Sequence, residues 1–170
     1  MAQDPGIAQP TIVRLTPDVL ERVSIAPRVI PPVDPAAAHR LLTRAVAARD
    51  VGSDSVAVAV AAIAGDTIVG LALAAPTAGG DQAELLAVGV APGNRRRGLA
   101  TALVQALSGA VEGPCVATVT VAERDPIEPL DFVLRASIAR RVLERAGFRI
   151  APVDSAIARI DPGAVRAERP

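Results

Sequence analysis

The amino-acid sequence predicts a mixed α/β (α+β) domain, in which about four helices flank a central mixed, mostly antiparallel sheet of six to seven strands. Three observations support this fold class. The chain has 170 residues, which is enough for one domain with a layered core. Its middle holds apolar segments that turn sharply on one another, as in an antiparallel meander. A further apolar segment is followed by a helical pattern and another strand-like segment, the order typical of a strand–helix–strand unit.

The first part of the chain is predicted to lead from a tail into a strand and two helices. Thr16 and Pro17 form a good helix start, because threonine caps a helix through its hydroxyl and proline fits the first helical position. His39, the only histidine, lies at the start of the second helix, where we expect it to be solvated or to cap rather than to catalyse. The expected segments are a flexible tail (1–10), a strand (11–15), a short helix (16–23), a proline-rich loop (26–35) and an amphipathic helix (36–49).

The middle of the chain predicts three strands in antiparallel order. Ala64, Gly65 and Asp66 separate two apolar segments, and glycine and aspartate favour a hairpin turn at this point. A Gly-rich connection then leads into a third apolar segment, which should pair with the strand before it. The expected strands are 56–63, 67–74 and 84–90.

The last part of the chain predicts two helices and further strands within a domain that spans 11–161. Gly147 suits the C-terminal end of the predicted 131–146 helix. The expected segments are a helix (98–111), a strand (115–121), a helix (131–146), two strands that close the sheet (148–153 and 155–160) and a flexible tail (162–170). The apolar stripe of the 131–146 helix is Val133, Leu134, Ile138, Val142 and Leu143.

The composition excludes several classes of function. All 18 basic residues are arginine, so no Schiff base with lysine, and no lysine anchor for a pyridoxal cofactor or a nucleotide phosphate, can form. The formal net charge is zero, and two phenylalanines are the only aromatic residues. Because nucleic-acid binding needs positive charge and often stacking, we expect no nucleic-acid partner.

The single cysteine and single histidine limit metal and redox chemistry. Cys115 cannot form a disulfide within the chain, and we interpret it as a packing residue rather than as a nucleophile. Because the chain has only one histidine in addition to this cysteine, it lacks the usual ligands of a metal ion, and we expect no metal site. The N-terminus lacks a signal-peptide pattern and the apolar segments are too short to cross a bilayer, so we expect a cytoplasmic protein without a membrane partner.

The turn between the third strand and the next helix looks suited to hold phosphate. The first backbone N–H groups of a helix have no partner within it and carry the positive end of its dipole. Gly98 and Ala100 leave room for the close approach of an anion, and Arg95, Arg96 and Arg97 add positive charge. These residues predict a pyrophosphate cradle.

Two motifs resemble the Gcn5-related N-acetyltransferase (GNAT) family. The residues Arg95 to Ala100 resemble its Arg/Gln-x-x-Gly-x-Gly/Ala signature, and Val90-Ala91-Pro92 resembles the strand end before it. Leu143 to Phe148 resembles the Tyr-Glu-Lys-Leu-Gly-Phe segment near the end of such enzymes. The alternatives are another phosphate-binding turn or a purely structural turn.

The resemblance implies a GNAT-like fold with strands splayed at an acetyl-CoA site and transfer of acetyl to a primary amine in a ternary complex. It implies that the catalytic base is Glu84, whose ordinary interpretation is a solvated strand residue, and that Val88 supplies the amide for the oxyanion. Strand alternation would put Glu84, Leu86, Val88 and Val90 on one face, provided that no bulge intervenes. The implied contacts to acetyl-CoA come from the backbone of Val88 and Val90 and from Arg95, Arg96, Arg97, Gly98, Leu99, Ala100 and Thr101.

The chain departs from the family pattern at the residue that protonates the leaving thiolate. Where many relatives have a tyrosine this chain has Leu143, and Ala136 stands where asparagine is common. The chain contains no tyrosine, so water would have to act as the acid. The alternative is a non-catalytic acyl-CoA-binding or regulatory domain. The acceptor, a small molecule or a protein, stays open, as does a homodimer, which is common among relatives.

Overall fold

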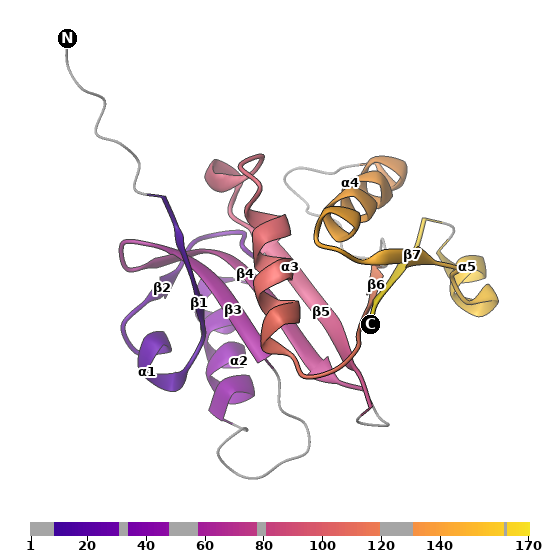
Figure 1. Ribbon diagram of the computed structural model, residues 1–170. Coiled ribbons are helices and arrows are strands. Elements are labelled where there is room, and N and C mark those ends of the chain that lie inside the picture. The colour runs from indigo at the N-terminus through magenta and orange to yellow at the C-terminus, as the bar shows by residue number, and fades with distance from the viewer. Residues whose placement is uncertain (1–8, 31–33, 48–57, 78–80, 120–130, 162) are drawn as a thin grey trace.

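The computed structural model shows an eight-stranded sheet with α-helices on both faces (Figure 1). It describes residues 9–30, 34–47, 58–77, 81–119, 131–161 and 163–170. The strands are β1 (Thr11–Arg14), β2 (Ser24–Ile25), β3 (Val58–Ala64), β4 (Thr67–Pro76), β5 (Ala83–Val90), β6 (Cys115–Val119), β7 (Arg149–Ala151) and β8 (Val165–Arg169). The helices are α1 (Pro17–Leu20), α2 (Pro35–Ala47), the 3-10 turn η2 (Pro92–Asn94), α3 (Leu99–Ala110), α4 (Phe132–Arg145) and α5 (Ser155–Ile160).

The sheet is mixed and mostly antiparallel, as predicted. Its strand order is β1-β3-β4-β5-β6-β8-β7, and β2 pairs with β4 beside this path. The β2–β4 and β5–β6 pairs are parallel, whereas the other pairs are antiparallel. The meander β3-β4-β5 and the unit β5-α3-β6 confirm the two patterns on which the predicted fold class depended.

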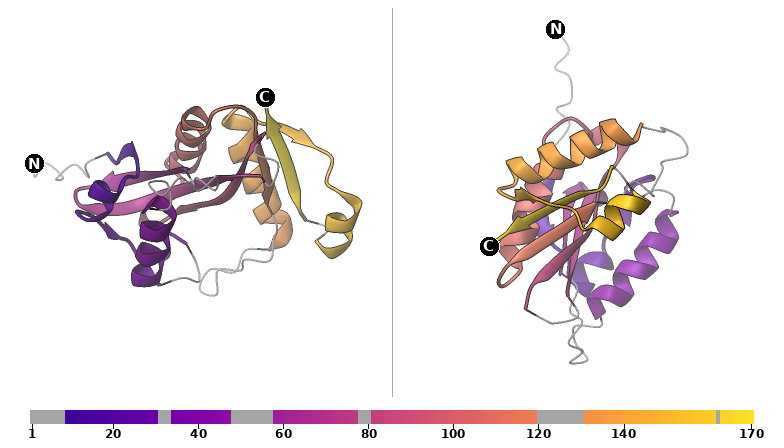
Figure 2. Two further views of the ribbon diagram at one scale, coloured as in Figure 1. Left: turned by 90° about the horizontal axis from the view of Figure 1, so that it is seen from below. Right: turned by 90° about the vertical axis from the view of Figure 1, so that its right-hand side faces the viewer.

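Helices cover opposite faces of the sheet (Figure 2). The helix α3 packs on β3, β4 and β5 through Leu103, Val104 and Leu107, which are all buried. On the other face lie α1 and α2, which contact each other. Nε2 of His39 on α2 lies 2.9 Å from the carbonyl oxygen of Leu20, so this half-buried side chain joins the two helices.

Two predictions for the C-terminal part are wrong. Residues 155–160 form the helix α5 rather than a strand, because Asp154 caps the segment by accepting from the N–H of Ala156 at 2.7 Å. Residues 162–170 are not a tail, since Val165–Arg169 forms β8, which lies between β6 and β7. Val165 and Ala167 alternate inward and are buried, which gives the physical reason. The domain therefore extends beyond residue 161.

The other predicted boundaries need smaller changes. The first short helix ends at Leu20 instead of continuing to Val23, and β2 follows it. The helix α4 begins at its Asp131 cap as expected, but only the C-terminal part of its stripe is covered: Leu143 is buried, whereas Val133, Leu134 and Ile138 are exposed. Parts of four predicted segments lie outside the described residues. They are the N-terminal tail up to residue 8, the end of the 36–49 helix (48–49), the start of the 56–63 strand and the end of the 115–121 strand.

Candidate functional site

The turn between β5 and α3 has the geometry of an anion cradle. After η2, Arg96 adopts φ 64° and Gly98 φ 77°, two left-handed residues that turn the chain sharply into the helix. Gly98 is the N-cap residue, and no side chain in the described ranges caps the helix. A Cβ at Gly98 would meet no atom of the described residues within 4 Å, so there is room beside this residue at the start of the helix.

The backbone at the start of α3 therefore presents donors to this space. The bond from the N–H of Ala102 to the carbonyl of Gly98, 3.1 Å long, belongs to the first helical turn. Earlier N–H groups have no acceptor within a helix. These belong to the sequence-predicted residues Leu99, Ala100 and Thr101, which are half-buried. Together with the helix dipole they favour a bound anion.

The three arginines of the turn do not share one environment. Arg96 and Arg97 are exposed, so their guanidinium groups can meet an anion in front of the helix. Arg95 is half-buried, and its Nε donates to the carbonyl oxygen of Val90 at 3.0 Å. Its side chain thus binds the end of β5, a contact that the sequence pattern did not indicate.

Beside the cradle, β5 and β6 separate. Within the described residues they pair from Ala83 to Leu85, which lie opposite Cys115 to Ala117, whereas β5 continues to Val90. Leu86 and Val88, which follow the paired part, have exposed fractions of 53% and 36%. Within the described part of the chain, the end of β5 next to the helix N-terminus therefore has an edge that β6 does not pair with. Figure 1 shows where β5, β6 and α3 lie.

The strand edge points its backbone groups into this opening. The N–H of Ala91 donates to Val69 of β4 at 2.8 Å, so residue 91 faces its antiparallel neighbour. Because backbone direction alternates along a strand, Val90 and Val88 direct their N–H and C=O groups away from β4. Val88 can pair with an extended ligand there, while the carbonyl of Val90 already accepts from Arg95.

A bulge in β5 separates Glu84 from Val88. Ala74 of β4 pairs with Leu85 and Leu73 pairs with Ala87, so Leu86 is an extra residue. Glu84 pairs with Ala75 and Val88 with Ala72. Residues three apart on a regular strand point to opposite faces, and paired residues share a face. The condition for Glu84, Leu86 and Val88 to share a face therefore fails, and Glu84 and Val88 lie on opposite faces.

Two glycines show what covers each face. A Cβ at Gly70 would approach Cδ1 of Leu103 on α3 to 2.9 Å, and Gly70 pairs with Val90, so Val90 and Val88 face the α3 side. A Cβ at Gly89 would lie 1.7 Å from the carbonyl oxygen of Val29. Glu84, half-buried, shares the face of Gly89, against which the loop after β2 packs.

The residues expected at the thiolate are not polar. Leu143 has an exposed fraction of 2% and packs in the core, and Ala136 is half-buried. Cys115 is likewise buried, which raises the pKa of its thiol, while the Arg169 guanidinium acts in the opposite direction. Its burial agrees with the interpretation of Cys115 as a packing residue.

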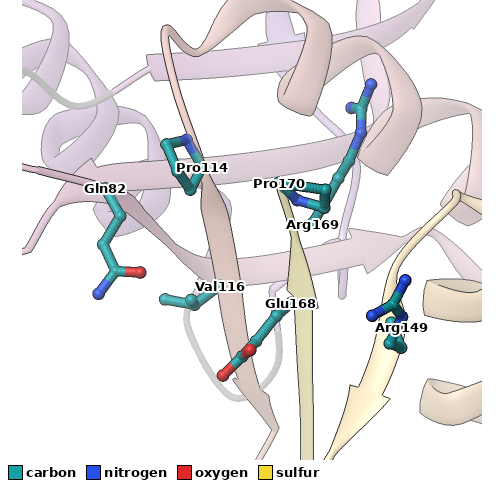
Figure 3. A pocket seen from close by; sticks show the side chains of 7 residues that line it. All are labelled: Gln82, Pro114, Val116, Arg149, Glu168, Arg169 and Pro170. Atoms are coloured by element: carbon teal, nitrogen blue, oxygen red, sulfur yellow. The ribbon is translucent and has the colours of Figure 1, made fainter.

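A separate hollow of about 280 Å³ lies at the beginning of β5 and β6, at the other end of β5 from the cradle (Figure 3). None of the predicted site residues lines it. Arg169 turns away from Glu168 and contacts Ser108 on α3. Sequence reasoning missed the hollow because it assigned β8 to a tail. The lining residues are Gln82, Pro114, Val116, Arg149, Glu168, Arg169 and Pro170.

The described parts of the chain contain neither a metal cluster nor a membrane-spanning helix. Among these residues, no three His, Cys, Asp or Glu side chains gather where they could hold a metal ion. None of the helices seen there has the length and apolar character needed to span a membrane.

Comparisons with known proteins agree with this geometry. The family model described as the acetyltransferase (GNAT) family matches residues 30–125. The chain is similar in structure to an acetoin utilization protein from Exiguobacterium sibiricum 255-15, with 16% identity and a TM-score of 0.75 over 96% of this chain and 88% of that chain. It is also similar to the GNAT domain of S. lividans PAT, with 19% identity and a TM-score of 0.57 over 93% of this chain and 88% of that chain.

A third similar structure is the PaiA N-acetyltransferase from Thermoplasma acidophilum in complex with coenzyme A. Its identity is 14% and its TM-score 0.56, over 94% of this chain and 98% of that chain. No curated protein matches the chain. At these identities the structural similarities show a shared fold, and they confirm the predicted fold class.

Proposed function

This chain belongs to the acetyltransferase (GNAT) family, whose model covers more than half of it, and we propose that it transfers acetyl from acetyl-CoA to a primary amine by direct attack in a ternary complex. The observation that carries the proposal is the junction of an uncapped helix N-terminus with an open strand edge. A pyrophosphate and an extended amide-containing arm require these two features side by side.

The residues of the cradle fit the pyrophosphate of acetyl-CoA. The amides of Leu99, Ala100 and Thr101 would donate to it, and Gly98 leaves the approach open. The exposed guanidinium groups of Arg96 and Arg97 would add charge-assisted hydrogen bonds. Neither interaction depends on a side chain that is already buried.

The strand edge fits the arm of the cofactor. An extended ligand adds to a sheet edge through backbone hydrogen bonds, and Val88 offers both of its backbone groups there. Acetyl-CoA supplies the acetyl group in activated form, as a thioester. We assign to the amide of Val88 the role of donating to the thioester oxygen as negative charge develops on it.

Glu84 is proposed as the general base. An amine with a pKa of about 10.4 is protonated at neutral pH and must lose a proton before it is nucleophilic. The bulge turns Glu84 away from the α3 face, so it would take this proton, directly or through water, from an acceptor on the opposite face. The reactants would then approach β5 from its two sides.

No side chain of this chain takes the place of a tyrosine acid. Leu143 is apolar and buried, and the sequence contains no tyrosine. A thiol with a pKa of about 8.5 is a tolerable leaving group, so water would serve as the proton donor at a cost in rate. The same observation favours a second candidate function, a domain that binds acyl-CoA without turnover.

Calorimetric titration with acetyl-CoA tests the cradle. The native chain should bind with micromolar affinity, and an Arg96→Glu, Arg97→Glu variant should lose at least about tenfold, because four units of charge change beside the phosphates. The matched control is Arg40→Glu, Arg44→Glu, which makes the same change at two exposed positions of α2, on the other face of the sheet.

Equal losses in both variants would show that only the net charge matters, and no binding by the native chain would overturn both candidate functions. A thiol-release screen over amine acceptors then separates them. Release of CoA that depends on the acceptor supports the transferase. Tight binding without release from any amine supports the binding domain.

A further inference from the structure

The side chain of Arg95 in the cradle turn contacts the end of the preceding strand. Its Nε donates to the carbonyl oxygen of Val90 at 3.0 Å, and the side chain is half-buried. Its own N–H donates to the carbonyl of Pro92 at 3.2 Å, which closes η2. Arg95 therefore connects the last residue of β5 with the turn that leads to α3.

The carbonyl that Arg95 binds belongs to the edge where the strands separate. Val90 directs its carbonyl away from β4, and no described residue of β6 pairs with β5 at this level. The bond therefore takes up an acceptor that would otherwise face the opening. Of the two valines expected to pair with an extended ligand, this leaves Val88 with both groups available.

We propose that Arg95 is a positioning residue that fixes the phosphate cradle to the open edge of β5, rather than a phosphate ligand like Arg96 and Arg97. The proposal rests on the proposed function, since it assumes that one ligand spans both parts. The hydrogen bond from Arg95 to Val90 would hold the amides at the start of α3 at a fixed distance and orientation from the backbone of Val88. The arm of the cofactor then meets a strand edge whose register is already set.

The chemistry of the bond offers a direct test with two substitutions. In glutamine the amide nitrogen lies as many bonds from Cα as Nε does in arginine, so Arg95→Gln can donate to Val90 without carrying charge. Arg95→Met fills similar space but cannot donate. If Arg95 acts through the hydrogen bond, Arg95→Gln should bind the ligand nearly as well as the native chain. If it acts through its charge on phosphate, Arg95→Gln should lose as much affinity as Arg95→Met.

Two ligands separate the cradle from the strand edge. Binding is measured for acetyl-CoA and for S-acetylpantetheine, which lacks the pyrophosphate and the nucleotide. Arg95→Met should weaken both by about tenfold, the effect of one charge-assisted hydrogen bond, and Arg95→Gln should restore most of the loss. The matched variant Arg96→Met should weaken acetyl-CoA alone. If Arg95→Met and Arg95→Gln both weaken acetyl-CoA and leave S-acetylpantetheine unchanged, Arg95 is a phosphate ligand and the proposal is overturned.

Amide hydrogen exchange on the free protein tests the same contact without any ligand. The N–H groups of Ala91 and Asn94 flank the contact, and that of Leu103 in buried α3 reports global opening. Arg95→Met should speed exchange at Ala91 and Asn94 about tenfold without changing Leu103, and Arg95→Gln should behave like the native chain. Unchanged exchange at both amides in Arg95→Met would overturn the proposal. If the native chain binds neither ligand the proposed function fails, while exchange still decides the role of Arg95.

Discussion

Glu84 and Val88 lie on opposite faces of β5, because the extra residue Leu86 changes the alternation of the strand between them. The amide proposed to stabilise the oxyanion and the carboxylate proposed as the base therefore belong to one strand but serve different sides of the sheet. This arrangement would let the acyl donor and the amine approach the same reaction centre without competing for space.

We expect Glu84→Gln to lower kcat by about 100-fold, because a general base contributes at least this much to many enzymes. The affinity for acetyl-CoA should stay unchanged, since Glu84 faces away from the cradle side. Initial rates and calorimetry with one productive acceptor check both expectations. The control Glu144→Gln removes an exposed carboxylate from α4 and should leave kcat as it is. A native kcat in Glu84→Gln would show that another group, or bulk water, takes the proton.

Gly89→Ala should destabilise the protein by about 3 kcal/mol, because the new Cβ would lie 1.7 Å from the carbonyl oxygen of Val29 and must displace backbone. Gly109→Ala is the matched control. Its Cβ meets nothing within 4 Å near the end of α3, so this variant should gain roughly 0.5–1 kcal/mol from helix propensity. Urea unfolding measures both. A stable Gly89→Ala protein would mean that the loop after β2 moves away from β5 at little cost.

The sequence allowed the core of the fold and the turn between β5 and α3 to be predicted. The turn residues at Gly65, the apolar alternation up to Val90 and the helical spacing after Gly98 are local signals, and the structure confirms the elements they predicted. Local signals also located Asp131 as the start of a helix.

Features that depend on contacts distant in sequence could not be predicted in this way. The bulge at Leu86 follows from the register with β4, and nothing in the segment itself marks it. In the sequence, residues 165–169 look like a polar tail, because Val165 and Ala167 are the only apolar residues that become buried there. They become buried only when β8 lies between β6 and β7. The role of the Arg95 side chain depends likewise on where the end of β5 lies.

Leu143→Tyr should not restore a proton donor for the thiolate. Leu143 is almost fully buried, so the larger ring would overpack the core and its hydroxyl would need a buried partner. We expect a loss of about 1–3 kcal/mol in the free energy of unfolding and no increase in kcat. Thermal unfolding and initial rates check the two parts. A gain in kcat would show that the α4 region rearranges in the complex and brings this position to the sulfur.

The titration of Cys115 should be visible in the stability of the protein at alkaline pH. Burial raises the pKa of this thiol above its ordinary value, and the opposing effect of Arg169 does not cancel it. The stabilising effect is then complete below the ordinary pKa of about 8.5, and it is lost as the pH rises toward the raised value, because the unfolded chain releases the proton first. Between these values the free energy of unfolding should fall by up to about 1.4 kcal/mol per pH unit.

The composition makes this measurement unusually clean. The chain has no lysine and no tyrosine, and arginine stays protonated, so above pH 9 Cys115 is the only side chain that titrates. Urea unfolding from pH 9 upward should show the fall in the native chain, while Cys115→Ala, less stable by about 1 kcal/mol from the lost side-chain volume, should show none. Parallel pH dependences in the two proteins would contradict a raised pKa at Cys115.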